Sequence, residues 1–133
     1  MLNKFLVPAT AFLAFFIDRV TKLYLPVTKY FNTGAAFGIL HGQILFLTVF
    51  AVIVLIVLVI YTIRENRNLT PAQKLGIGMI IGGTAGNLLD RVLYGYVIDF
   101  IDLPFVDFPV FNMADVSINI GAAILLITLL VRK

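Results

Sequence analysis

The sequence predicts an all-α membrane protein with four transmembrane helices, and two observations lead to this prediction. The 133-residue chain is 61% hydrophobic and has a mean hydropathy of +1.05, whereas a soluble domain is roughly 45–50% apolar. The chain also divides into four long apolar segments joined by short polar or glycine-rich loops. Its length suits one helical domain over residues 1–133.

The four spans are marked by different signals. They are predicted at residues 5–25, 43–63, 71–93 and 111–131. Residues 43–63 carry no charge and make about 31 Å of helix, which matches a hydrocarbon core of about 30 Å. The first segment follows Lys4 as in a signal peptide, but no small-residue cleavage site comes after it, so a retained span is expected. Thr70 and Pro71 form a typical helix start for the third.

Basic residues predict the orientation of these spans. With four spans, six of the ten basic residues fall on one side of the membrane: Lys4, Arg64, Arg67, Lys74, Arg132 and Lys133. The positive-inside rule makes that side cytoplasmic, with both termini inside. The loops at 26–42 and 94–111 then face outward. Residues 27–31 are of β type and predict an extended stretch at the membrane surface, and the alternating stretch 96–102 predicts a short strand.

The acidic residues are concentrated in and between the last two apolar segments. Five of the seven lie within residues 86–115. Counted from the basic residue at the inner end of its helix, Asp18 lies at a depth of about 21 Å, Asp90 about 24 Å and Asp115 about 26 Å. Ionisable groups in spanning helices are costly and usually functional. We therefore expect one polar cluster inside the bundle, near its outer mouth.

Helical spacing groups the polar residues on shared faces. One face of the third segment carries Asn87, Asp90 and Arg91, and one face of the fourth carries Asn112, Asp115 and Asn119. Glycines recur every four residues along the third segment, at Gly78, Gly82 and Gly86. This spacing favours a groove for close helix packing.

Asp99 and Asp115 are the candidate catalytic pair. Each lies in an apolar run with no basic neighbour in sequence. Two carboxyls in contact in a low-dielectric site cannot both ionise easily, so one serves as base and the other as acid. Such a pair can activate water for amide hydrolysis. A structural role for both residues remains the alternative from spacing alone.

The other acids have structural interpretations. Asp18 and Lys22 are four residues apart, as in an ion pair on one helix face. Asp90 stands beside Arg91, which favours a structural clamp, and Asp102 and Asp107 are expected to be solvated.

Other chemistries find little support. The chain has no cysteine, which excludes thiolate ligands and a cysteine nucleophile. The one histidine, His41, lies in a glycine-flanked turn and is expected to be solvated. Motifs for serine hydrolases, zinc peptidases and phosphate binding are absent. Metal binding by carboxylates alone is an open alternative, but no metal or other cofactor is predicted. No basic–aromatic stretch indicates nucleic-acid binding.

Two rival functions use the same residues. A small proton- or ion-coupled transporter or channel would use the membrane acids as a relay, but it predicts polar residues spread from face to face. A structural assembly protein would dock a partner on the glycine face, which leaves the convergent acids and asparagines unexplained.

Several sequence blocks together resemble those of lipoprotein signal peptidase, the type II signal peptidase. The blocks are DRVTK (18–22), NTGAAFG (32–38), GGTAGNLLDR (82–91), YVIDFID (96–102) and FPVFNMADVSINIG (108–121). They occur in the family's order and span nearly the whole chain.

The resemblance implies a metal-independent aspartic endopeptidase of the bacterial inner membrane, with four spanning helices and a small extracytoplasmic β-cradle with a mobile surface helix. Its substrates are diacylglyceryl-modified prolipoproteins, cut before the lipidated cysteine, and globomycin-type peptides inhibit it. The catalytic aspartates correspond to Asp99 and Asp115. The implied substrate-binding residues are Asn32, Asn87, Arg91 and Asn112, and the implied structural supports are Asp18, Lys22 and Asp90. A monomer that binds membrane lipid and no nucleic acid is expected.

Two departures from the family pattern stand out. The chain is shorter than most members, which predicts a reduced outer lid. Val116 follows the second aspartate, where serine is common, and Ser117 lies on a different helix face. A local hydrogen bond to Asp115 is therefore expected to be absent.

Overall fold

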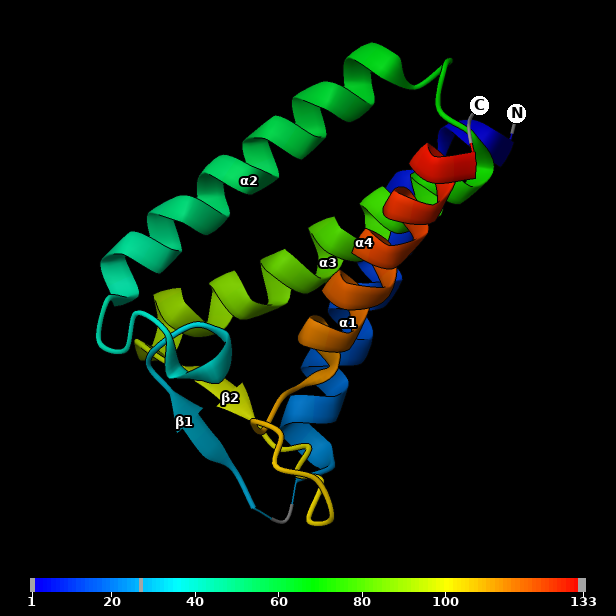
Figure 1. Cartoon of the computed structure of the whole chain (residues 1–133). Coiled ribbons are helices and arrows are strands. Elements are labelled where there is room, and N and C mark those ends of the chain that lie inside the picture. Colours follow the sequence, from blue (N-terminus) through cyan, green and yellow to red (C-terminus); the bar gives the residue numbers. More distant parts are fainter. Residues whose placement is uncertain (1, 27, 132–133) are drawn as a thin grey trace.

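The computed structural model describes residues 2–26 and 28–131, which form four long helices and one two-stranded sheet (Figure 1). The helices are α1 (Leu6–Tyr24), α2 (Ile44–Glu65), α3 (Pro71–Tyr94) and α4 (Met113–Val131). The strands are β1 (Tyr30–Asn32) and β2 (Val97–Asp99). Two short 3₁₀ turns are also present, Leu2–Lys4 and Ala36–Gly38.

The four predicted helical segments are confirmed, with two shifted boundaries. α2 continues to Glu65, so the polar loop predicted at 64–70 begins only at Asn66. α4 begins at Met113 and not at 111, because Phe111 forms an antiparallel bridge with Ile101. Thr70 caps α3, as the sequence predicts, and it does so in a reciprocal capping box with Gln73 that was not predicted. The basic residues Arg132 and Lys133 lie outside the described residues.

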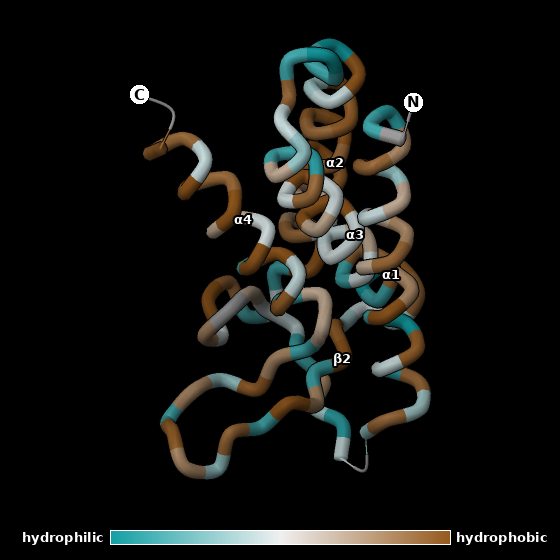
Figure 2. The backbone as a smooth tube through the Cα atoms, turned by 90° about the vertical axis from the view of Figure 1, so that its right-hand side faces the viewer, coloured by the Kyte–Doolittle hydropathy of each residue, from teal (hydrophilic) through white to brown (hydrophobic). Residues whose placement is uncertain are grey.

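Successive helices alternate in direction. α1, α3 and α4 lie side by side, and α2 leans away from them with most of its contacts on α3 (Figure 1). The start of α1, the α2–α3 connection and the end of α4 share one end of the molecule, and the sheet lies at the opposite end (Figures 1 and 2). The two segments expected to face outward are therefore on one side.

Two of the described helices, α2 and α4, are long and apolar enough to cross a membrane by length and composition. Both are mainly brown in Figure 2, and their apolar side chains are exposed, with Leu45 78% and Leu130 67% accessible. So large an exposed apolar surface is unusual for a soluble protein. α1 and α3 carry buried charged side chains instead, and for them a spanning role stays a prediction.

The predicted glycine groove packs against α1. A Cβ atom added at Gly78 would lie 2.7 Å from Thr10 Cβ. One at Gly82 would overlap the Ala11 carbonyl oxygen, and one at Gly86 would overlap the Asp18 carboxylate. Only glycine lets the two backbones approach this closely.

A second glycine contact joins α3 to α4 and was not predicted. Cβ atoms at Gly76 and Gly121 would each lie within 2.8 Å of the other's carbonyl oxygen, and one at Gly83 would lie 2.5 Å from the Ala114 carbonyl oxygen. Gly76 and Gly83 are seven residues apart on α3, but Gly121 belongs to a different helix, so no single-helix pattern reveals the contact.

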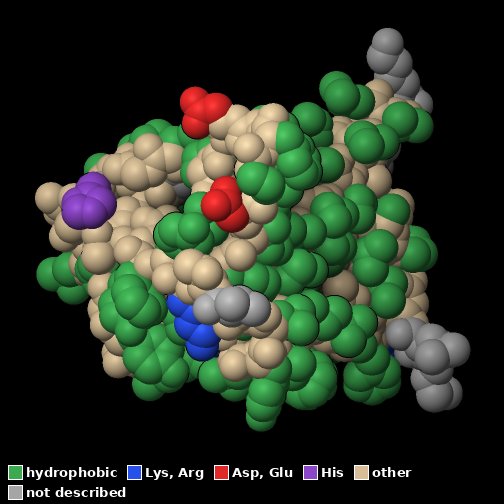
Figure 3. Space-filling view, turned by 90° about the horizontal axis from the view of Figure 1, so that it is seen from below, with side chains coloured by type: hydrophobic (Ala, Val, Ile, Leu, Met, Phe, Trp, Pro, Cys, Tyr) green, Lys and Arg blue, Asp and Glu red, His purple; other side chains and the backbone are tan. Residues whose placement is uncertain are grey.

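The sheet closes one end of the bundle, opposite the end at which α1 begins and α4 ends (Figure 1). β1 and β2 pair antiparallel, with Tyr30 opposite Asp99 and Asn32 opposite Val97. The strand predicted within 96–102 is confirmed as β2, and the extended stretch predicted at 27–31 overlaps β1 at Tyr30 and Phe31. Val27 lies outside the described residues. The loop surface seen from this end is mostly hydrophobic, with only scattered charged side chains (Figure 3).

We expect Gly82→Ala to lower the free energy of unfolding by about 1–3 kcal/mol, because the added methyl group must push α1 away from α3. Unfolding in detergent micelles, followed by circular dichroism, measures this change. Val92→Ala, at an exposed position of the same helix, is the matched control and should change stability by no more than about 0.5 kcal/mol. Equal stability of the two variants would contradict the close packing.

Candidate functional site

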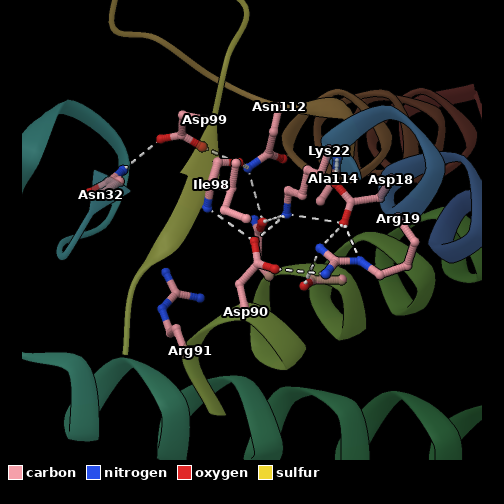
Figure 4. Close-up of polar contacts among 12 residues, drawn as sticks. Asp18, Arg19, Lys22, Asn32, Asp90, Arg91, Ile98, Asp99, Asn112 and Ala114 are labelled. Atoms are coloured by element: carbon pink, nitrogen blue, oxygen red, sulfur yellow. Dashed lines mark hydrogen bonds and ion pairs between the residues drawn. The ribbon is translucent and has the colours of Figure 1, made fainter. Parts of the chain in front are cut away.

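Two acids and two bases form a buried charged cluster between α1 and α3 (Figure 4). Arg19 Nη2 lies 2.7 Å from Asp18 Oδ2, and Arg19 Nη1 lies 2.7 Å from Asp90 Oδ1. Lys22 Nζ lies 3.0 Å from Asp18 Oδ2 and 2.8 Å from Asp90 Oδ2. Asp18, Lys22 and Asp90 are fully buried. The cluster is formally neutral, so attraction between its opposite charges offsets the desolvation cost of burying them.

The predicted Asp18–Lys22 pair is confirmed, but the predicted Asp90–Arg91 clamp is wrong. Asp90 pairs with Arg19 and Lys22 of α1, and Arg91 instead donates from Nη2 to the Gly34 carbonyl oxygen at 3.3 Å. Different parts of the fold hold the two side chains, α1 cations for Asp90 and the backbone beyond β1 for Arg91, so they diverge although they are adjacent in sequence. Sequence reasoning missed Arg19, which follows Asp18 and reaches α3 only through its long side chain.

The charged cluster also fixes the backbone of the neighbouring elements. Asp90 Oδ2 accepts the Ile98 N–H of β2 at 3.0 Å, and Asp18 Oδ1 accepts the Ala114 N–H of α4 at 3.0 Å. Both hydrogen bonds are buried. Each lies next to a candidate catalytic residue, since Ile98 precedes Asp99 and Ala114 precedes Asp115. The cluster therefore sets the positions of both.

Asp99 and Asp115 receive hydrogen bonds mainly from neutral amides. Asn32 Nδ2 donates to Asp99 Oδ2 at 3.0 Å, and Asn112 Nδ2 donates to Asp99 Oδ1 at 2.7 Å. Asn87 Nδ2 donates to Asp115 Oδ1 at 2.9 Å, and the Asn112 N–H donates to Asp115 Oδ2 at 3.1 Å. Among the described residues, neither carboxylate forms a salt bridge.

Asn112 connects the two carboxyl groups. Its side chain contacts Asp99, and its backbone N–H contacts Asp115. The Asp115 N–H donates back to Asn112 Oδ1 at 3.0 Å, which completes a reciprocal cap at the start of α4. Because Asn112 is completely buried, it holds both carboxyl groups at one place.

Lys22 orients the remaining amide. Its Nζ donates to Asn87 Oδ1 at 3.0 Å, and Asn112 Nδ2 lies 3.1 Å from the same oxygen. With its carbonyl oxygen occupied, the Asn87 amide nitrogen is turned toward Asp115. The charged cluster is linked in this way to the second carboxyl group through a neutral side chain.

Both carboxyl groups face a cavity of about 920 Å³ at the sheet end of the bundle. Much of its wall is apolar, including Val97, Phe108 and Phe111. Its polar lining residues are Asn32, Asn87, Arg91, Asp99, Asp115 and Asn119. All predicted substrate-contacting residues except the buried Asn112 line it directly. The predicted supports Asp18, Lys22 and Asp90 do not.

Burial and the nearby Asp115 carboxylate raise the pKa of Asp99 to about 6. The hydrogen bonds from Asn32 and Asn112 act in the opposite direction, because they stabilise the charged form. A carboxyl group with this pKa exchanges its proton near neutral pH, as general acid–base catalysis requires.

The remaining candidate residues lie apart from this site. His41, Asp102 and Asp107 are exposed, as expected for solvated side chains. Ser117 is buried, and no hydrogen bond joins it to Asp115 within the described residues. Among the residues that the structure describes, no group of three His, Cys, Asp or Glu side chains could hold a metal ion.

An apolar helical bundle with two carboxyl groups facing a lined cavity has the architecture of a membrane hydrolase, and comparison with known proteins agrees. The family model described as signal peptidase (SPase) II matches residues 2–131. The chain therefore belongs to the signal peptidase II family.

Individual relatives and solved structures are similar along most of the chain. It is 42% identical over 116 residues to the lipoprotein signal peptidase of Shouchella clausii, covering 87% of this chain and 73% of that one. It is 43% identical over 124 residues to the same enzyme of Syntrophomonas wolfei, covering 89% and 79%. A solved structure described as a bacterial membrane enzyme has a TM-score of 0.83 at 35% identity, covering 93% of this chain and 87% of that one.

We expect Asp18→Asn to lower the free energy of unfolding by about 3–5 kcal/mol, because it leaves two buried cations with one carboxylate. Thermal unfolding in detergent measures the loss, and Asp102→Asn, at an exposed acid, is the matched control. An Asp18→Asn variant that melts normally but has lost all turnover would contradict the structural role and indicate a catalytic one.

Proposed function

We propose that this protein is an aspartic endopeptidase that removes the signal peptide from diacylglyceryl-modified prolipoproteins by cutting before the lipidated cysteine. The observation that carries the proposal is that Asp99 and Asp115 face one cavity and, among the described residues, accept hydrogen bonds from neutral groups only. Of the cations near the pair, Arg19 and Lys22 are paired with Asp18 and Asp90. Arg91 lines the same cavity and forms no salt bridge among the described residues. Family membership supports the same activity.

The two carboxyl groups divide the work of hydrolysis. The ionised one takes a proton from water, and the resulting nucleophile attacks the scissile carbonyl carbon. The protonated one donates to the carbonyl oxygen and stabilises the tetrahedral intermediate. Asn112 contacts both groups and keeps them in register. As the intermediate collapses, the carboxyl group that took the water proton gives it to the leaving nitrogen, and the other carboxylate recovers its proton from the diol. The C–N bond breaks, which releases the signal peptide with a new carboxyl terminus and leaves a new amino terminus on the lipidated cysteine.

Polar residues around the pair bind substrate or brace the site. Asn32 and Asn87 line the cavity and each holds one carboxylate. Arg91 also lines it, and its buried Nε has no hydrogen-bond partner among the described residues, so donors remain for a substrate carbonyl. Asp18, Lys22 and Asp90 form the brace beneath. This chemistry needs no metal, because water is activated by carboxylates.

The position of the cavity suits a substrate held in lipid. In this proposal all four helices span a bacterial inner membrane as a monomer, with both termini cytoplasmic and the cavity near the extracytoplasmic face. The diacylglycerol keeps the substrate in the bilayer, and its scissile bond then arrives at the depth of the acids. Water reaches this level without crossing the membrane centre. A globomycin-type peptide would compete for the same cavity.

The transporter alternative receives less support. A proton or ion relay needs polar groups along the whole path, but the titratable cluster is confined to the sheet half of the bundle. Between Ile44 and Ile63, α2 offers no charged residue. Nothing in this arrangement connects the two ends.

We expect Asp99→Asn and Asp115→Asn each to lower the cleavage rate by about 10²–10⁴-fold or more, because each removes one partner of the acid–base pair. A gel-shift assay on a lipidated prolipoprotein in detergent, with and without globomycin and with EDTA present throughout, measures the rate. Asp102→Asn and Asp107→Asn are the controls and should cleave normally. Full activity in a folded Asp99→Asn or Asp115→Asn variant would refute the mechanism.

We expect kcat/KM to fall as pH rises through about 6, because loss of the Asp99 proton removes the group that donates to the scissile carbonyl oxygen. Asn32→Ala should move this limb to higher pH, since it deletes a hydrogen bond that stabilises the Asp99 carboxylate. A pH profile with a fluorogenic lipopeptide measures both. Asn68→Ala, in the distant α2–α3 loop, should leave the midpoint unchanged, and a shift of the Asn32 variant to lower pH would be contradictory.

A further inference from the structure

Asn119 is a polar side chain in the cavity wall that has no role in the proposed catalytic mechanism. It lies on α4 four residues after Asp115, so it shares that residue's helix face one turn, about 6 Å, farther along the axis. It is exposed and lines the cavity. Because α4 runs away from the sheet end (Figure 1), Asn119 lies deeper in the bundle than the two carboxyl groups.

The surroundings of Asn119 are apolar. Apart from Asp115 one turn away, the neighbouring wall residues on α4 are apolar: Val116, Ile118 and Ile120. From residue 118 to the end of α4, Thr128 is the one other hydrogen-bonding side chain, and its hydroxyl is satisfied by the Leu125 carbonyl oxygen at 2.8 Å. Asn119 has no such local partner: within the described residues its carboxamide forms no hydrogen bond. An unpaired amide in an apolar helix is costly unless it gains a partner.

The chemistry of the side chain indicates what that partner is. A carboxamide carries one acceptor oxygen and two N–H donors, so it can pair with both the N–H and the C=O of a single peptide unit. An extended peptide entering an apolar cavity brings such units without water to solvate them. A side chain that offers both functions at one point therefore suits a substrate backbone better than an acyl chain.

We propose that Asn119 binds the substrate backbone on the N-terminal side of the scissile bond. This inference rests on the proposed function. The signal-peptide part of the substrate occupies the deeper membrane, and an extended chain advances about 3.3 Å per residue. A point about 6 Å below Asp115 then meets the peptide unit about two residues before the bond that is cut. Asn119 holds the signal peptide in the extended form that the two carboxyl groups require.

Asn119→Leu, which keeps the size of the side chain and removes both hydrogen-bonding functions, tests the contact. We expect KM for a lipidated peptide to rise about three- to tenfold, with kcat changed less than twofold and the pH midpoint unaltered. Thr62→Val, which removes a polar group from α2 away from the cavity, is the matched control and should keep the wild-type KM.

Ester-substituted substrates identify the peptide unit that is bonded. Their effect on the wild-type enzyme can be measured whether or not the variant folds. Replacing one backbone N–H by oxygen, one, two or three residues before the scissile bond, should raise KM of the wild-type enzyme about three- to tenfold at one position, expected at the second. The same ester should have little further effect in Asn119→Leu. An unchanged KM in Asn119→Leu, or ester effects equal in both enzymes at every position, would overturn the inference.

Cleavage of the lipidated peptide that carries no ester, by the wild-type enzyme, separates the two proposals. If the wild type cleaves and Asn119→Leu matches it, only the role of Asn119 fails. If the folded wild type leaves the lipidated peptide intact, the proposed function fails as well.

Discussion

The buried cluster of Asp18, Arg19, Lys22 and Asp90 is the constraint on which the rest of the structure depends. Its two positive and two negative charges balance inside the bundle, where a single unpaired charge would be very costly. Its carboxylates also bind backbone N–H groups of β2 and α4. One electrostatic unit therefore joins α1 to α3 and fixes the two elements that carry Asp99 and Asp115.

This arrangement explains why four nearby acids take two different roles. The cations that approach Asp18 and Asp90 are occupied there, so Asp99 and Asp115 are left with asparagine and backbone donors. A strong cation beside Asp99 would favour its ionised form, whereas burial beside another carboxylate raises its pKa to about 6. In the proposed mechanism, neutralising one pair of acids is what leaves the other pair available for proton transfer.

Close helix packing allows this cluster to form. At Gly86 the missing side chain leaves space for the Asp18 carboxylate, so one glycine contributes both to the helix contact and to the polar network. Gly83, on the other side of α3, admits the Ala114 carbonyl against the helix. Glycines on both faces of α3 bring α1 and α4 near enough for short side chains to meet, and asparagine and aspartate reach across only at this separation.

The sequence alone determined the helices, the strand near Asp99 and most of the polar residues around the cavity, because these depend on local properties. Hydrophobic length, the Thr70 cap and alternation near Asp99 act over a few residues, and the motif blocks named the correct family. Only the tertiary structure decided which bases pair with Asp90. The Asp90–Arg91 prediction was wrong because α1 brings Arg19 and Lys22 to Asp90, while Arg91 donates to the Gly34 carbonyl oxygen. Arg19 was missed because it reaches Asp90 across a helix interface. Partners 71 residues apart are chosen by packing geometry, which no local pattern of residues records.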